Sequence, residues 1–194
     1  MTTKLDLRAE LSVTKRKMDC TGVAAIAEWI CDRPKQIPRL VELLWDDNVA
    51  VSNRAADVLE RITREPSPAL QRAVEALSGE LIGLLEEARA AKLRWNLALT
   101  IPRLTLKGPE CFRVAATLTG WLDGESSVVK TSALHGLADL ARKEPSLITG
   151  VVDSLRMAER SGTPAMRARS RILLKELDSN RKKRQNRSSI HMFG

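Results

Sequence analysis

The side chains best suited to chemistry are few and scattered along the chain. Of the two histidines, only His135 lies outside the C-terminal tail, so a base-activated nucleophile would depend on this residue alone. Helical spacing places His135 away from the apolar stripe, which favours a surface residue over a proton shuttle. Cys20, Cys31 and Cys111 never stand in a CxxC spacing, a pattern typical of free thiols in a reducing compartment. The sequence therefore predicts no metal site and no cofactor.

Paired carboxylates occur only where helices are expected to end. Asp46/Asp47 and Glu86/Glu87 are the clearest pairs, and both fall in predicted turns, where acids are solvated. Glycoside hydrolysis needs two acids facing each other across a cleft, and the spacing indicates none. Neither GxxxxGK[ST] nor a GxGxxG after a strand occurs. These patterns predict that the protein is not an enzyme.

The net charge of +8 is mostly a property of the two ends. The basic N-terminal segment, 1–18, carries +3 and the basic C-terminal tail, 178–194, carries +4, which leaves +1 for 19–177. That central part is polarised, with −6 over 19–88 and +7 over 89–177. This polarity predicts weak head-to-tail self-association at low ionic strength.

Hydropathy indicates no contact with a membrane interior. No apolar run approaches the length of a transmembrane span, and the first residues lack the apolar core of a secretory signal. We expect a cytoplasmic protein.

The elements that would carry any site are helices. In 51–62, apolar residues at relative positions 0, 4, 7, 8 and 11 form one stripe of a helix. The same stripe recurs in four other segments, which we take as the second helices of two-helix repeats of about 37 residues. These segments are 19–30, 93–104, 129–140 and 166–177.

An amphipathic first helix precedes most of these stripes. The expected first helices are 37–47, 69–87, 111–124 and 146–162. Ser67-Pro68, Ser126/Ser127 and Thr163-Pro164 suit helix starts, since Ser and Thr cap N-termini and proline fits the first turn. The heptapeptides EWICDRP (28–34), ERITREP (60–66) and DLARKEP (139–145) are interpreted as the exit of a second helix followed by the proline of the next unit; the expected fourth copy, RLTLKGP (103–109), lacks the acid.

The segment PRLVELLWDDNVAVSNRAADVLERI resembles a HEAT repeat. It has a proline early in the first helix, an acidic turn and a second helix of the form Val-x-x-x-Ala-x-x-x-Leu-x-x-Ile. Ser52 replaces the arginine usual after that valine, whereas Arg94, Lys130 and Arg167 restore it in later units. The resemblance covers 19–177, with a weaker unit whose first helix would be 5–14. It implies an all-α, right-handed superhelix of about five helix pairs.

Two narrower resemblances add little about function. RWNLALTIPRL, SSVVKTSALHGLADLARKEP and GTPAMRARSRILLKEL are similar to short bacterial HEAT-repeat proteins without an assigned activity. HEAT-like DNA glycosylases share the repeat type but depend on aromatic residues beside a catalytic Asp. Here the four Trp lie in four different predicted helices, Tyr is absent, and no Asp–Trp pair matches that pattern. A glycosylase is therefore the third interpretation.

Several side chains of the second helices should point away from the core. These are Asn53, Trp95 and Thr131, then Asp57, Leu99, His135 and Ile172, then Glu60, Pro102 and Lys175. Trp95, Leu99 and Ile172 are large and apolar, so they either pack on a neighbouring repeat or bind a partner. Together with His135 they are the partner-binding candidates. Pro102 is expected to kink its helix.

Basic residues form a second recurring set on these helices. The basic-surface candidates are Arg94, Lys130, Arg167, Arg169 and Arg171, with Arg54 at a matching position. They would either donate to turn carbonyls between repeats or follow a phosphate backbone. The basic tail has two interpretations of its own, a solvated end or an arm for nucleic acid or an acidic partner.

These observations predict a non-enzymatic scaffold that binds a protein partner on the concave face of the repeat array. The alternative is a nucleic-acid-binding HEAT protein that uses 89–177 and the tail. An aromatic content of 3% argues against platforms that stack single-stranded bases.

Overall fold

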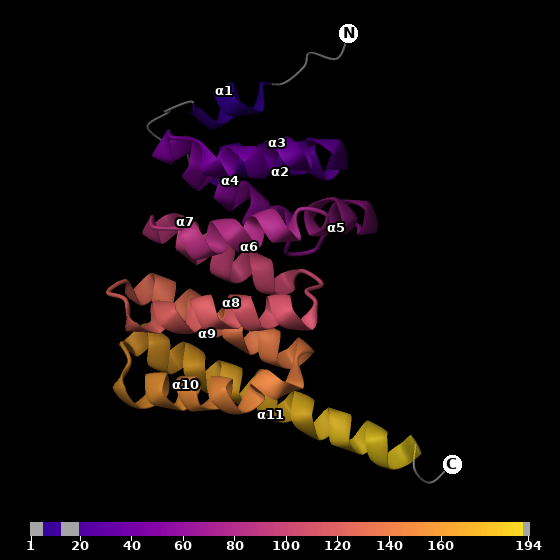
Figure 1. Cartoon of the computed structure of the whole chain (residues 1–194), viewed down its shortest axis with the longest axis vertical. Coiled ribbons are helices and arrows are strands. Elements are labelled where there is room, and N and C mark those ends of the chain that lie inside the picture. The colour runs from indigo at the N-terminus through magenta and orange to yellow at the C-terminus, as the bar shows by residue number, and fades with distance from the viewer. Residues whose placement is uncertain (1–5, 13–19, 192–194) are drawn as a thin grey trace. The chain divides into compact units, whose positions relative to one another are not determined.

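The computed structural model describes residues 6–12 and 20–191, and the side chains of 6–12 and 22–180. Every regular element in these ranges is a helix (Figure 1). The chain divides into two compact units, Met1–Lys107 and Gly108–Gly194, each described here by itself. The boundary lies inside RLTLKGP, the copy of the repeated heptapeptide that lacks an acid. No helix in the described ranges has the length and apolar character needed to cross a bilayer.

Unit 1 consists of short helices, several of which continue into a turn of 3-10 helix. Its elements are α1 (Leu7–Ser12), α2 (Cys20–Cys31), η1 (Pro34–Gln36), α3 (Ile37–Glu42), η2 (Leu43–Trp45), α4 (Val49–Ile62), α5 (Pro68–Glu75), α6 (Ser78–Glu87), α7 (Ala91–Thr100) and η3 (Ile101–Arg103). The predicted second helices 51–62 and 93–104 correspond to α4 and α7, and they pack against each other. Asn48 caps α4 and Ser67 caps α5, the latter as predicted.

The core of unit 1 is built on the apolar stripe of α4. Val51, Ala55, Val58, Leu59 and Ile62, the five stripe residues, are all buried. α1, α2, α3 and α7 pack around this helix. The periodicity of one short segment thus located the centre of the unit.

Unit 2 also alternates first and second helices, and most of them are longer than those of unit 1. Its elements are α8 (Gly108–Gly120), η4 (Trp121–Asp123), α9 (Ser127–Lys143), η5 (Pro145–Leu147), α10 (Ile148–Ser161) and α11 (Pro164–His191). α9 contacts α8, α10 and α11, and its buried residues include Val129, Ala133, Leu137 and Leu140. Ser126 caps α9 and Thr163 caps α11, both as predicted. The backbone of α11 stays helical through most of the predicted tail.

Two details differ from the sequence prediction. The predicted helix 69–87 is two helices, because the chain turns at Ala76 and Leu77. Of the predicted first helix 5–14, the described part forms α1, and 5, 13 and 14 lie outside the described residues. Pro102 does not kink a continuing helix: α7 ends at Thr100, and Pro102 is buried in η3. Proline offers no N–H to the ladder, and its ring disfavours helix in the residue before it.

Candidate interaction surface

In α4, α7 and α11, the side chain at the recurring basic position donates a hydrogen bond to a backbone carbonyl that precedes the helix. Arg94 Nε donates to Ala88 O at 2.7 Å in unit 1, and Arg167 Nη1 donates to Gly162 O at 3.2 Å in unit 2. Ser52, at the same position of α4, donates from Oγ to Leu44 O at 2.8 Å. Of the two uses predicted for these residues, the bond to a turn carbonyl is the one seen.

Lys130 is the exception to this arrangement. It occupies the same position on α9, yet within the described residues its ammonium group makes no hydrogen bond or ion pair. Its side chain instead lines a groove in unit 2. The other basic candidates have protein acceptors: Arg54 donates to Leu11 O at 2.6 Å, and Arg171 to Arg167 O at 3.3 Å.

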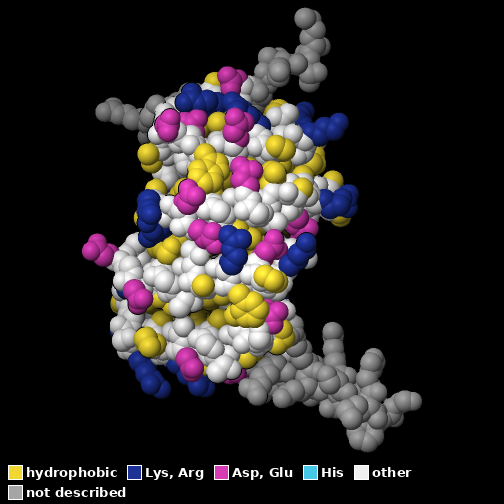
Figure 2. Space-filling model, in the orientation of Figure 1, with side chains coloured by type: hydrophobic (Ala, Val, Ile, Leu, Met, Phe, Trp, Pro, Cys, Tyr) yellow, Lys and Arg dark blue, Asp and Glu magenta, His cyan; other side chains and the backbone are white. Residues whose placement is uncertain are grey.

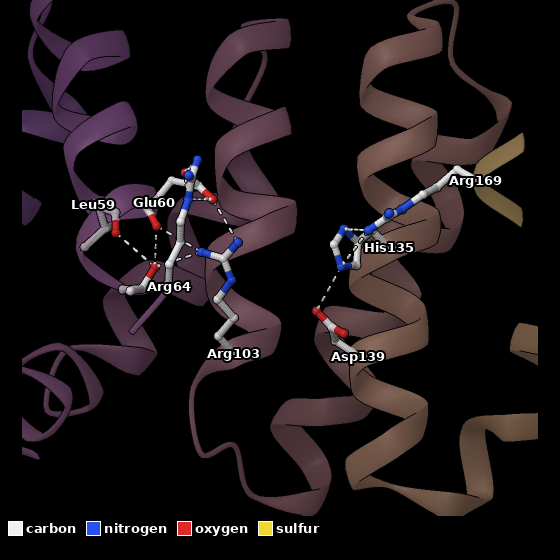
Figure 3. A network of polar contacts seen from close by, with 8 residues as sticks. Leu59, Glu60, Arg64, Arg103, His135, Asp139 and Arg169 are labelled. Carbon is white, nitrogen blue, oxygen red and sulfur yellow. Dashed lines mark hydrogen bonds and ion pairs between the residues drawn. The ribbon is translucent and has the colours of Figure 1, made fainter. Parts of the chain in front are cut away.

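A buried carboxylate organises the exit of α4 in unit 1 (Figure 3). Glu60 was predicted to point away from the core, and this was wrong: it is only 6% exposed. Arg64 Nη2 and Arg103 Nη2 donate to its two carboxylate oxygens at 2.7 and 2.8 Å. Arg103 also donates to the backbone O of Glu60 at 2.9 Å, so η3 is tied to α4 through both groups.

The environment of Glu60 favours its charged form. Burial acts to raise the pKa of this carboxyl, but the hydrogen bonds from Arg64 and Arg103 outweigh it and hold the pKa below its ordinary value. Glu60 is therefore ionised at neutral pH. Asp57, one turn earlier, joins α4 to α7: it pairs with Lys92 at 2.7 Å and accepts from Asn96 Nδ2 at 2.9 Å.

A half-buried polar network joins α9 to α11 in unit 2 (Figure 3). Arg169 Nη2 lies 2.8 Å from His135 Nδ1 and 3.1 Å from Nε2. His135 Nε2 lies 3.6 Å from Asp139, and Arg142 bridges Asp139 to Glu176. Because a guanidinium only donates, a ring nitrogen of His135 must accept this hydrogen bond. His135 is thus a link between helices, half-buried where sequence spacing predicted a surface position.

The apolar candidates remain accessible next to these networks. Trp95 on α7 is 37% exposed and Ile172 on α11 is 49% exposed, whereas Leu99 is half-buried. Ile172 follows Arg169 by three residues, so the two lie on one face of α11. Within unit 2 the structure therefore places His135, Arg169 and Ile172 close together. Trp95, Leu99 and Arg94 belong to unit 1.

Exposed apolar side chains also occur at positions that the sequence prediction missed. They are Trp45, Val49, Phe112, Val128 and Met157. Met157 stands out because it lies off the buried stripe of α10, which is Val151, Leu155 and Ala158. The stripe rule, applied to the first helices as it was to the second, would have identified it.

Charges of both signs are interspersed on the visible surface. Figure 2 shows Lys and Arg next to Asp and Glu on this face, without a continuous basic area. Five of the six basic positions considered above already donate to a carbonyl or to His135. Each guanidinium carries five N–H groups, so these bonds position the arginines and leave further donors on each of them.

Comparison with known proteins identifies the architecture but no family. No family model matches the chain, and no curated protein matches it. Three crystal structures of engineered proteins are similar to it. One is 21% identical with a TM-score of 0.62 over 89% of this chain and 80% of that one. The second is 19% identical with a TM-score of 0.59 over 90% and 78%, and the third 20% identical with 0.58 over 89% and 47%.

These neighbours are all-helical repeat proteins. At this level of identity the likeness concerns the fold alone. The chain therefore has an all-α fold of the helical-repeat kind.

Proposed function

We propose that the chain is a non-enzymatic scaffold of HEAT-like helix pairs, wound as a right-handed superhelix, that binds a protein partner. The partner would contact the exposed face of the second helices. The observation that carries this proposal is the exposure of Trp95 and Ile172 on α7 and α11. Burial of large apolar side chains against a partner contributes favourable binding free energy, and aromatic anchors dominate protein interfaces.

The polar surroundings of these two residues support the same function. Asp57 with Lys92 and Asn96 lies along α4 and α7, and His135 with Arg169 along α9 and α11. These groups are already paired, so a partner that covers Trp95 or Ile172 leaves few unpaired charges beneath it. Such a surface is typical of a protein interface with an apolar centre and a polar rim.

The experiment that tests this function is affinity capture with the intact chain. Trp95→Ala and Ile172→Ala are compared with Phe112→Ala, which removes a similarly exposed aromatic ring from a first helix, α8. We expect recovery of the main partner to fall by about tenfold for Trp95→Ala and to stay unchanged for Phe112→Ala. Circular dichroism verifies the fold of each variant. If all three variants recovered the partner as well as the wild type does, the surface around Trp95 and Ile172 would not be the binding site.

Nucleic-acid binding remains the alternative prediction. It would require phosphate contacts from basic residues that now bond to carbonyls and to His135. Its test is the salt dependence of duplex binding, which should be steep and should weaken on charge reversal at Lys130 and Arg171.

A further inference from the structure

A groove opens in unit 2 where two turns lie side by side. One turn joins η4 to α9 and the other joins α10 to α11. The groove has a volume of about 400 Å³. Sites for small ligands span about 300 to 1,000 Å³, so this volume suits a small molecule.

The floor of the groove is apolar. Leu134, Ala158 and Met166 lie there, and each is nearly fully buried. Leu122 and Met157 line it as well, and Met157 is 69% exposed. An unbranched methionine adapts its shape to a neighbouring group, so it forms a wall that can close over an apolar ligand.

One unpaired cation lines this apolar surface. Lys130 stands at the helix position where Ser52, Arg94 and Arg167 each donate to the carbonyl of the preceding turn. Among the described residues Lys130 has no such acceptor and no ion pair. A side chain that elsewhere holds the turn is therefore available here to a negatively charged group.

Two hydroxyls add a neutral donor to the same groove. Ser127 Oγ and Thr163 Oγ1 are 2.9 Å apart and join the two turns. When one hydroxyl donates to the other, the O–H of the accepting residue stays available for a ligand. The polar side of the groove thus offers one ammonium and one hydroxyl donor.

The acids of the groove disfavour a ligand with several negative charges. Asp123 and Glu125 also line it, are exposed, and form no ion pair with Lys130. Their carboxylates would repel a di- or triphosphate more strongly than a ligand with one negative charge. A single carboxylate near Lys130 keeps the attraction of the ammonium with less of this repulsion.

We propose that this groove binds a small amphipathic monoanion, namely a carboxylate carried on an apolar chain or ring. The apolar part lies over Leu134, Ala158 and Met166, and the carboxylate pairs with Lys130. The site is formed by the turns and the first turns of α9 and α11. Neither Trp95 nor Ile172 lines it, so the groove does not use the side chains proposed for protein binding.

The test uses decanoate, below its micellar concentration, as the probe for the intact chain. Isothermal titration calorimetry gives the affinity, and amide chemical shifts give the location. We expect decanoate to bind with shifts at Ser127–Lys130 and Gly162–Met166, and decanol to bind more weakly. Lys130→Met should weaken decanoate binding by about tenfold, because a charge-assisted contact is lost.

Two further variants make the result specific. Met157→Glu alters an exposed side chain, so the fold should survive, and its negative charge should also weaken decanoate binding. Lys175→Met is the matched control, since it removes an exposed lysine from α11 outside the groove. Three outcomes would overturn the proposal: no binding of decanoate, equal weakening by Lys130→Met and Lys175→Met, or tighter binding of inorganic phosphate than of decanoate.

Discussion

Within each unit, a polar network joins the segments of two second helices. The two networks differ in how deeply their acids are buried. In unit 1 the central acid is Glu60, whose side chain is 7% exposed and which holds Arg103 of η3 against α4. In unit 2 the acids are Asp139 and Glu176, whose side chains are 21% and 48% exposed, and they join α9 to α11 through Arg142. Both networks connect segments that are 34 to 43 residues apart.

This difference in depth decides what each network contributes. A buried carboxylate has lost its hydration, so its two arginines must replace water, and removal of one partner leaves a charge without compensation. A half-exposed acid keeps part of its hydration, and its ion pair adds little to stability. We therefore expect unit 1 to depend on its network for folding and unit 2 to tolerate the loss of its own.

The largest expected effect is that of Glu60→Ala. Arg103, whose side chain is only 24% exposed, would lose its carboxylate partner. We expect the free energy of unfolding of unit 1 to fall by about 3 kcal/mol, the scale measured when a buried pair is broken. Hydrogen exchange of the amides of α4 and α7, followed by mass spectrometry, measures this change in the relevant unit.

The matched variant in unit 2 is Asp139→Ala. This substitution should lower the free energy of unfolding of unit 2 by about 1 kcal/mol or less, because Asp139 is less buried than Glu60 and Arg142 keeps its ion pair with Glu176. Exchange in α9 and α11 reports it. Equal losses in the two units would mean that burial of the acid does not set the energetic difference between the networks.

Most of the helical framework was predictable because it depends on neighbours in sequence. The stripe of 51–62 identified the buried face of α4, and the caps of α5, α9 and α11 followed from Ser67, Ser126 and Thr163. A cap and a stripe involve residues no more than a few turns apart, so their signals are local. The break between α5 and α6 carried no proline or glycine at Ala76 and Leu77, and it was missed.

The candidate surfaces were less predictable because they depend on distant partners. Helical spacing placed Glu60 on the outer face, but its burial follows from Arg103, 43 residues later. His135 is likewise half-buried because Arg169 reaches it from α11. The exposure of Trp95 and Ile172 agrees with the helical spacing. Periodicity predicts which face of a helix is apolar, whereas polar contacts with distant residues decide which polar side chains become buried.

A further prediction concerns the packing that stabilises unit 2 if its ion pairs contribute little. A Cβ atom at Gly162 would lie 2.4 Å from Ala158 O and 2.9 Å from Met166 Cβ, so the turn between α10 and α11 packs too closely for a side chain. We expect Gly162→Ala to lower the free energy of unfolding of unit 2 by about 2 kcal/mol through overpacking. Hydrogen exchange in α10 and α11 measures it.

Gly150→Ala is the control for that substitution. Gly150 lies within α10 and has open space around its Cβ position, so alanine should stabilise the helix by about 0.5 to 1 kcal/mol. A neutral Gly162→Ala would show that the turn adjusts freely. Unit 2 would then depend more on its ion pairs than we infer.

The last expected effect is a pH dependence that belongs to unit 1. The pKa of Glu60 is lower in the folded chain than in the unfolded one, so its stabilisation is complete above the unfolded value, near 4.3, and is lost as pH falls through the folded value. Glu60→Gln removes this titration and keeps the size of the side chain. The difference in free energy of unfolding between the wild type and Glu60→Gln should be constant above about pH 5.5 and shrink at lower pH by on the order of 1 kcal/mol, the scale of a charge-assisted hydrogen bond.

Urea unfolding at pH 7, 5, 4 and 3 measures this difference, and the contributions of all other carboxylates cancel because both proteins carry them. A difference that grows on acidification would mean that burial, which raises the pKa of Glu60, outweighs the two arginines.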